Sequence, residues 1–96
     1  MDEGNVPEKK FSTGVISATV WKNKHKSASG DVIEYRTVSL QRRYRDKSGE
    51  WKSSNSLRTN DLPKAILVLS KAYESLVLRD GESSDAIEEY EIEEID

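Results

Sequence analysis

Alternating apolar and polar positions predict two strands in the first half of the chain. From Val15 to Trp21 every even position is apolar, so one face of this segment is expected to be buried. Residues 23–31, where Lys, Ser and a Gly interrupt the alternation, are expected to form a loop. Alternation returns from Val32 to Arg45, with Val38 and Leu40 on one face and mostly polar residues on the other. The pattern therefore predicts a sheet with one apolar and one polar face.

A short turn, Asp46–Gly49, has Asp first and Gly last, which is typical of a type I turn, and it should lead into a third strand. If Arg45 pairs with Glu50, then Tyr44 faces Trp51 and the apolar residues of both strands share one face. The opposite face is then expected to be open to solvent and to display basic and hydroxyl side chains: Arg43, Arg45, Lys52, Ser54, Ser56 and Arg58.

A period of 3.6 residues predicts an amphipathic helix over residues 62–78, with Pro63 in its first turn. Its apolar stripe is expected to comprise Leu62, Ile66, Leu69, Tyr73, Leu76 and Val77, with Ala65 and Ala72 at its edge. The predicted fold is α+β: an antiparallel sheet of three to four strands, covered on one face by a single C-terminal helix. Leu67 and Val68 lie off the stripe and would be exposed in a monomer, and a core of this size supplies little stability, so we expect a homodimer.

Charge divides the 96 residues into three parts. Residues 11–79 contain 13 Lys and Arg against 6 Asp and Glu, whereas residues 80–96 contain nine acids and no base. We interpret residues 1–10 as a flexible N-terminus, 11–79 as a basic domain and 80–96 as a disordered acidic tail. The lack of cysteine, of a long apolar run and of an apolar N-terminus leads us to expect no membrane segment and no secretion, and a cytoplasmic (nucleoid-associated) or nuclear protein.

Aromatic and basic side chains together make the candidate nucleic-acid-binding site. Its residues are Trp21, Lys22, Tyr35, Arg43, Tyr44, Arg45, Trp51, Lys52 and Arg58. Lys and Arg neutralise phosphates, and exposed rings stack on unpaired bases, which a duplex would hide. The sequence therefore predicts a protein that binds single-stranded DNA, with RNA as an open alternative.

Other interpretations of these residues stay open. Surface arginines are often simply solvated, and Tyr44 with Trp51 would also serve as a cross-strand pair that steadies a hairpin. An enzyme, a metal site or a cofactor is not expected, because His25 is the one histidine and the carboxylates are concentrated in the tail. The alternative function is a protein-interaction adaptor that acts through its helix or through its tail, where Ile and Tyr alternate with acids. The acidic tail is also a candidate competitor for the basic face.

Three segments between residues 11 and 78 carry a family pattern: Phe11, Gly14, Ile16 and Val20-Trp21; then VSLQRRYRDKSGEWK; then SLRTNDLPKAILVL. The clearest part is a hairpin with Tyr44, Asp46, Gly49, Glu50 and Lys52 at fixed spacing. The pattern resembles the transcriptional coactivators of the positive cofactor four (p15) family, including a small uncharacterised prokaryotic branch. The resemblance implies a curved antiparallel sheet, one C-terminal helix, a homodimer formed largely through helices, and single-stranded DNA in basic channels on the sheets, in transcription, replication or repair. The chain differs from that family in opening its helix with NDLPKA and in placing its acidic segment after the domain.

Overall fold

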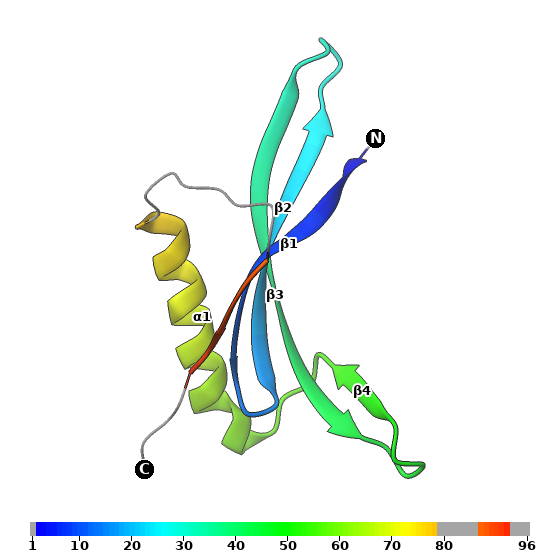
Figure 1. Cartoon of the computed structure of the whole chain (residues 1–96), viewed down its shortest axis with the longest axis vertical. Coiled ribbons are helices and arrows are strands. Elements are labelled where there is room, and N and C mark those ends of the chain that lie inside the picture. Colours follow the sequence, from blue (N-terminus) through cyan, green and yellow to red (C-terminus); the bar gives the residue numbers. More distant parts are fainter. Residues whose placement is uncertain (1, 79–86, 93–96) are drawn as a thin grey trace.

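The computed structural model describes residues 2–78 and 87–92, and within them five strands form one open mixed sheet with a single α-helix beside it (Figure 1). The strands are β1 (Asp2–Thr13), β2 (Ile16–Lys26), β3 (Val32–Arg45), β4 (Trp51–Ser54) and β5 (Glu88–Glu91). A 3₁₀ turn, η1 (Thr59–Asp61), leads into the helix α1 (Leu62–Val77). The order across the sheet is β4-β3-β2-β1-β5. The α+β class is confirmed, but the sheet has five strands, and β5 runs parallel to β1 while the other neighbours are antiparallel.

The strand β1 lies largely in the segment that was predicted to be flexible. Residues 2–10 continue directly into Phe11, and the whole strand pairs with β2 across a two-residue turn in which Gly14 has a φ of 60°. Glu8 connects β1 to β3 across the intervening strand β2. Its carboxylate accepts two hydrogen bonds from Arg36 on β3, at 2.8 and 3.2 Å. This contact also raises the pKa of Arg36 above its usual value. The N-terminal segment is therefore part of the sheet.

The strands β2 and β3 extend into a long arm that projects beyond the helix (Figure 1). Residues 23–26, predicted to belong to a loop, are paired with β3, and the loop is confined to residues 27–31. One reason is Asn23, which is buried and whose side-chain amide donates to Thr37 Oγ1 at 3.0 Å and to the Tyr35 carbonyl at 3.4 Å. Hydrogen bonds between polar side chains and the neighbouring strand thus allow β2 to continue through this polar segment.

The core lies between α1 and the first two strands. Its buried residues are Phe11, Ile16, Ala18 and Val20 on the sheet and Ala65, Val68 and Ala72 on the helix. The predicted apolar face of the helix is wrong: Val68, expected to be exposed, is fully buried, whereas Ile66 and Tyr73 are each 66% exposed. Two alanines on the buried side let the helix approach the sheet closely, so the smaller side chains face the core. Leu67 is half-buried.

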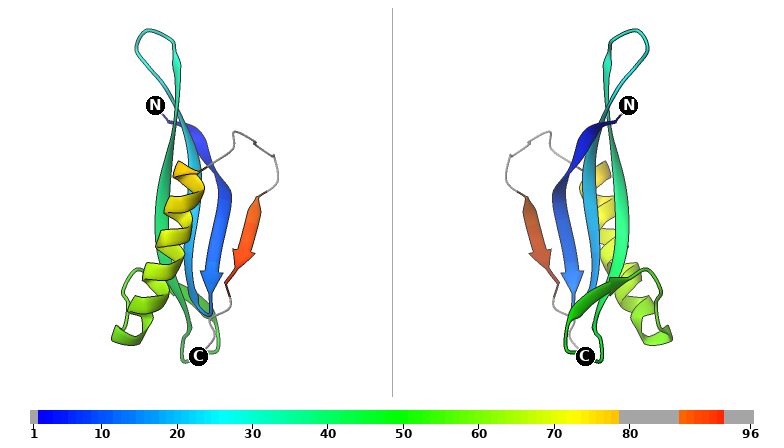
Figure 2. Two further views of the ribbon diagram at one scale, coloured as in Figure 1. Left: turned by 90° about the vertical axis from the view of Figure 1, so that its left-hand side faces the viewer. Right: turned by 90° about the vertical axis from the view of Figure 1, so that its right-hand side faces the viewer.

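The side of the sheet opposite α1 is called the open face from here on. The β2–β3 arm and the β3–β4 hairpin both lean away from the helix, so the open face is concave along its length (Figure 1). The right-hand panel of Figure 2 looks onto this face, with the helix behind the sheet. On the helix side, coverage is partial: α1 packs mainly against β1 and β2, and Val38 on β3 is 39% exposed. Within the described residues no helix is long and apolar enough to cross a membrane.

Candidate nucleic-acid interface

The pairing of β3 with β4 decides which side chains reach the open face. Arg45 pairs with Trp51 and Tyr44 pairs with Lys52, so the predicted pairing of Arg45 with Glu50 is wrong by one residue. The turn explains the difference: Asp46 N donates to Glu50 O at 2.9 Å, which leaves only three residues in the loop, and Gly49 takes a φ of 90°. This is the three-residue hairpin loop that needs a left-handed residue at its end. Because a shift of one residue exchanges the two faces of a strand, Trp51 moves to the open face and Lys52 leaves it.

Asp46 organises this turn. Its Oδ1 accepts hydrogen bonds from Ser48 N at 2.9 Å, Ser48 Oγ at 2.7 Å and Glu50 N at 3.0 Å. Its Oδ2 lies 3.2 Å from Lys52 Nζ. The hydrogen bonds from Ser48 and from the Glu50 backbone, together with Lys52, hold the pKa of Asp46 below its ordinary value. The carboxylate therefore supports the register that turns Trp51 outward.

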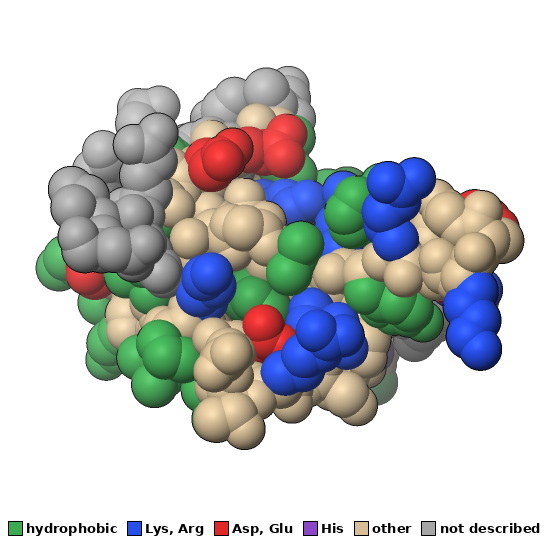
Figure 3. All heavy atoms as spheres, turned by 90° about the horizontal axis from the view of Figure 1, so that it is seen from below, with side chains coloured by type: hydrophobic (Ala, Val, Ile, Leu, Met, Phe, Trp, Pro, Cys, Tyr) green, Lys and Arg blue, Asp and Glu red, His purple; other side chains and the backbone are tan. Residues whose placement is uncertain are grey.

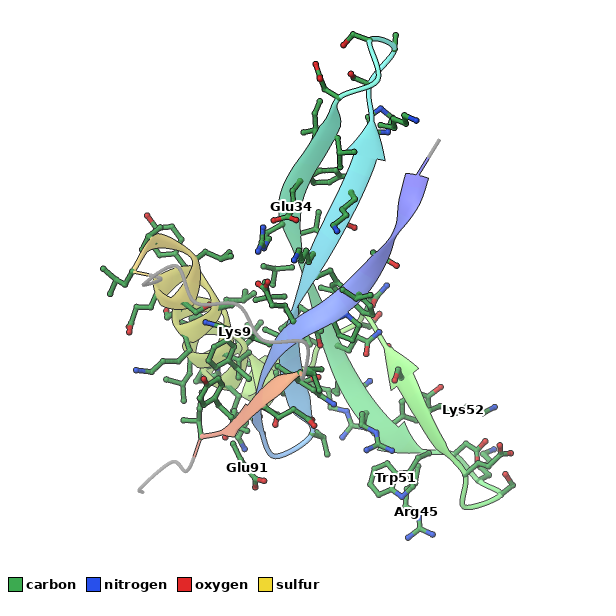
Figure 4. The ribbon with its side chains drawn as sticks, turned by 45° about the horizontal axis from the view of Figure 1, so that its top comes forward. Lys9, Glu34, Arg45, Trp51, Lys52 and Glu91 are labelled. Atoms are coloured by element: carbon green, nitrogen blue, oxygen red, sulfur yellow. The ribbon has the colours of Figure 1, made fainter. Side chains whose placement is uncertain are left out.

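Trp51 and two arginines form a compact group, here called the Trp51 cluster, which consists of Arg43, Arg45 and Trp51. The Cζ atoms of Arg43 and Arg45 lie 5.1 and 5.6 Å from the centre of the Trp51 ring, which is the distance of a cation–π contact. Arg45 Nε also donates to the Gly49 carbonyl at 3.3 Å. Trp51 nevertheless remains 51% exposed. Figure 4 shows Trp51 and Arg45 side by side at the hairpin, with Lys52 directed away from them.

Basic side chains concentrate at this end of the molecule. Seen from below, Lys and Arg gather over the half that holds the β3–β4 hairpin (Figure 3). The acids of β5 lie at the other edge of the sheet, where Glu89 pairs with Lys10 and Glu91 pairs with Ser12. Three strand spacings, about 14 Å, separate β5 from β3. Figure 4 accordingly places Glu91 well away from Arg45, so the described acids of the tail do not lie on the Trp51 cluster.

Two further predicted rings lie on the open face near the arm. Tyr35 is 43% exposed, and Trp21 is half-buried and donates from Nε1 to Ser39 Oγ at 3.0 Å. Along β3, Tyr35 lies eight residues from Arg43, which corresponds to about 26 Å of strand. Small polar side chains fill the space between: Ser17, Thr19, Thr37, Ser39 and Gln41. The open face therefore carries a ring at each end and a hydroxyl-lined floor.

The other four predicted site residues are not part of this face. Lys22, Tyr44 and Lys52 point to the helix side, where Lys22 lies 3.5 Å from Glu34 and the Tyr44 ring packs against the Arg42 guanidinium at 5.4 Å. Arg58 is exposed in the connection before η1. The structure thus brings together Arg43, Arg45 and Trp51, adds Trp21 and Tyr35 at a distance, and separates the rest.

Two residues that support the site were not predicted. Arg42 looks like its basic neighbours in the sequence, yet it is structural, since Nε donates to the Ser56 carbonyl at 3.0 Å and lies 3.5 Å from Asp61. Lys10 pairs with Thr19 and so belongs to the open face. Recognising that Lys9 to Thr13 alternates as a strand would have located Lys10. Among the described residues no group of three or more His, Cys, Asp or Glu is placed to hold a metal ion.

The chain matches no family model, and comparisons with curated proteins and with solved structures find no significant match.

Proposed function

We propose that the protein binds single-stranded DNA on the open face, with the Trp51 cluster as its main contact. The observation that carries this proposal is an exposed indole with two guanidinium groups within 5.6 Å of its centre. A base stacked on the indole would have its phosphates close to both arginines. Stacking contributes about 1–3 kcal/mol per base and tolerates any sequence, while the arginines supply the salt-dependent part of the affinity.

The rest of the open face favours binding of single-stranded over duplex nucleic acid. Tyr35 and Trp21 offer a second stacking position about 26 Å along β3, and the floor between carries only small hydroxyl and amide groups. Bases inside a duplex expose their edges but not their faces, so rings on a sheet favour unpaired nucleic acid. Such a protein would act where single strands are exposed in transcription, replication or repair, in a nucleoid or a nucleus.

The test is a competition experiment. A labelled oligo-dT bound to the full chain is displaced by unlabelled oligo-dT, by duplex DNA and by RNA of the same length, at low and at moderate salt. We expect oligo-dT to compete better than duplex and the affinity to fall as salt rises. Equal or better competition by duplex would refute the proposal. The RNA series decides which kind of single strand is preferred.

A homodimer through α1 belongs to the same proposal. Five apolar residues of the helix are at least 40% exposed: Leu62, Ile66, Leu69, Tyr73 and Val77. They follow one another at intervals of four and three residues, the spacing of a helix–helix seam. Val38 on β3 is exposed on the same side of the sheet. A second copy would cover this surface with an identical stripe and bring two open faces into one molecule.

The exposed stripe also supports the alternative function, a protein-interaction adaptor. An apolar helix face of this kind can take a partner helix instead of a second copy. The oligomeric state of the free protein distinguishes the two cases. If a second copy covers the stripe, the free protein is a dimer; if a different partner covers it, the free protein is a monomer. Affinity for single strands that collapses with salt would favour the nucleic-acid function over the adaptor.

A further inference from the structure

Part of the acidic tail forms a strand on the edge of β1. Residues 88–91 run parallel to Lys9–Ser12, and the backbone N–H of Ile92 donates to the Ser12 carbonyl at 2.7 Å. Disorder was predicted for residues 80–96, and this prediction does not hold for residues 87–92; residues 80–86 and 93–96 lie outside the described residues. Figure 2 shows β5 beside β1, on the edge farthest from β4.

The segment is held by two side chains at alternate positions. The Tyr90 ring stacks on Phe11, with centroids 5.0 Å apart and planes inclined by 12°. Two residues later, Ile92 is half-buried and packs against the core. Phe11 itself is only 7% exposed and belongs to that core. The edge of β1 thus presents an apolar position to which an aromatic side chain of an extended peptide binds.

A shallow open pocket continues this position toward the helix. It has a volume of about 280 Å³ and lies between Lys9, Phe11 and Tyr90 on the sheet and the last turns of α1, which contribute Lys71, Glu74 and Ser75, with Leu78 just past the helix. On the open face, Lys10 is the cross-strand partner of Glu89. Lys71 Nζ lies 3.8 Å from Glu74 of the same helix, so the lysines that flank the acidic segment are Lys9 on the helix side and Lys10 on the open face. The chemistry of the edge matches acidic side chains placed around an aromatic one.

The contact between β5 and β1 is small, so another peptide strand can replace β5. The strand has four residues, its pairing is of the parallel type, and Ile87 and Tyr90 remain 38% and 43% exposed. Parallel pairs are slightly less stable per residue than antiparallel ones. A segment tethered by a short connection binds at an effective concentration of about a millimolar, so an affinity too weak to hold a free peptide can hold a tethered one.

We propose that the edge of β1 from Lys9 to Ser12 is a docking site for extended acidic peptides with an aromatic and an aliphatic residue two positions apart. The chain's own residues 87–92 fill this site in the free protein. A partner protein that carries the same pattern would add its strand in their place and release the tail. This interface is separate from the Trp51 cluster and does not depend on nucleic-acid binding.

The experiment uses the full chain and a labelled peptide with the sequence of residues 85–96. A double variant, Tyr90→Ala with Ile92→Ser, weakens the resident strand and leaves β1 intact. We expect the peptide to bind this variant at least tenfold more tightly than it binds the unaltered protein. A peptide in which the same Tyr and Ile are replaced by Ser keeps every acid and serves as the matched control. Circular dichroism of each variant checks that the sheet and helix are retained.

A second measurement does not depend on any variant. Unlabelled peptide is added to the isotopically labelled native chain up to about 5 mM, a few times the expected effective concentration of the tail. Saturable changes confined to the amides of residues 9–12 and 87–92 would support the proposal. No change in this range, or equal binding of the control peptide, would overturn it, because charge alone would then explain the contact.

Discussion

At the scale of single residues, the difference between Trp51 and the other aromatic residues matters most. Trp21 and Tyr44 are half-buried and engaged with Ser39 and Arg42, whereas Trp51 offers half of its surface to solvent beside two arginines. A ring that is already packed contributes to stability; a ring that is exposed beside cations is available for a base. The site is therefore predicted to depend on one indole more than on any other ring.

Trp51→Ala should weaken binding of oligo-dT by about 1–3 kcal/mol, roughly 5- to 150-fold, because it removes one stacking surface. Trp51→Phe keeps a ring at the same position and should retain most of the affinity. Fluorescence anisotropy with a labelled oligonucleotide measures both. If Trp51→Ala binds as well as the native chain, stacking on this ring plays no part.

The charges of Arg45 and Lys52 provide a matched comparison, since they lie on neighbouring strands but on opposite faces. Each phosphate contact to a single strand contributes about 0.7 to the slope of log affinity against log salt. Arg45→Gln should lower this slope by about 0.7, and Lys52→Gln should leave it nearly unchanged. If Lys52→Gln lowers the slope more than Arg45→Gln does, the single-stranded DNA binds on the helix side of the sheet.

At the scale of elements, the β3–β4 hairpin depends on its turn. Asp46 accepts three hydrogen bonds and pairs with Lys52, and Gly49 supplies the positive φ that a three-residue loop requires. These two residues favour the register in which Arg45 pairs with Trp51 over the register in which Arg45 pairs with Glu50. A substitution in the turn should therefore change the position of Trp51 on the open face.

The hairpin should lose order in acid. A carboxylate whose pKa is lowered on folding stabilises the folded form above its ordinary pKa, 3.8 for Asp46, and this contribution disappears as the pH falls through the lower folded value. We expect the NMR signal of the Trp51 indole to be constant near neutral pH and to move toward its disordered position below about pH 4. Asp46→Ala should show the disordered signal already at neutral pH. The same change at Asp31, in the β2–β3 loop, should not affect Trp51, and an effect of equal size there would contradict the role of Asp46.

At the scale of the whole molecule, a small core and an exposed apolar helix face belong together. Few large side chains of the described residues are fully buried, and the helix buries Val68 between two alanines while its larger residues remain outside. A second copy packed on these residues would extend the core across a two-fold axis. The oligomeric state is therefore linked to stability.

Ile66→Glu should convert a dimer into a monomer, because it places a charge in the middle of the exposed stripe. Analytical ultracentrifugation across a range of concentrations measures the change. Val68→Ala is the contrasting variant: it should cost about 2 kcal/mol of unfolding free energy through the core without a direct effect on the interface. A native chain that sediments as a monomer at every concentration would contradict the dimer and favour the adaptor.

Several features of the fold could be read from the sequence because they depend on local periodicity. The alternation around Ile16, Ala18 and Val20 and again along β3 located two strands and their buried face, and the 3.6-residue period located the helix. The same alternation assigned Arg43 and Arg45 to the open face, and the strand pairing places Trp21 and Tyr35 there as well. A period of two or 3.6 residues follows from backbone geometry, so it needs no knowledge of distant contacts.

Other features were decided only by the tertiary structure. The register of β4 depends on whether the loop has three or four residues, and a difference of one residue moves Trp51 from one face to the other. The helix has apolar residues on most sides, so only the fit of Ala65, Val68 and Ala72 against the sheet selects its buried face. The pairing of β1 with β5 joins the two ends of the chain, whose residues are mostly charged and give a weak local signal. Local pattern thus determined which segments form elements, while contacts between distant segments determined which faces those elements present.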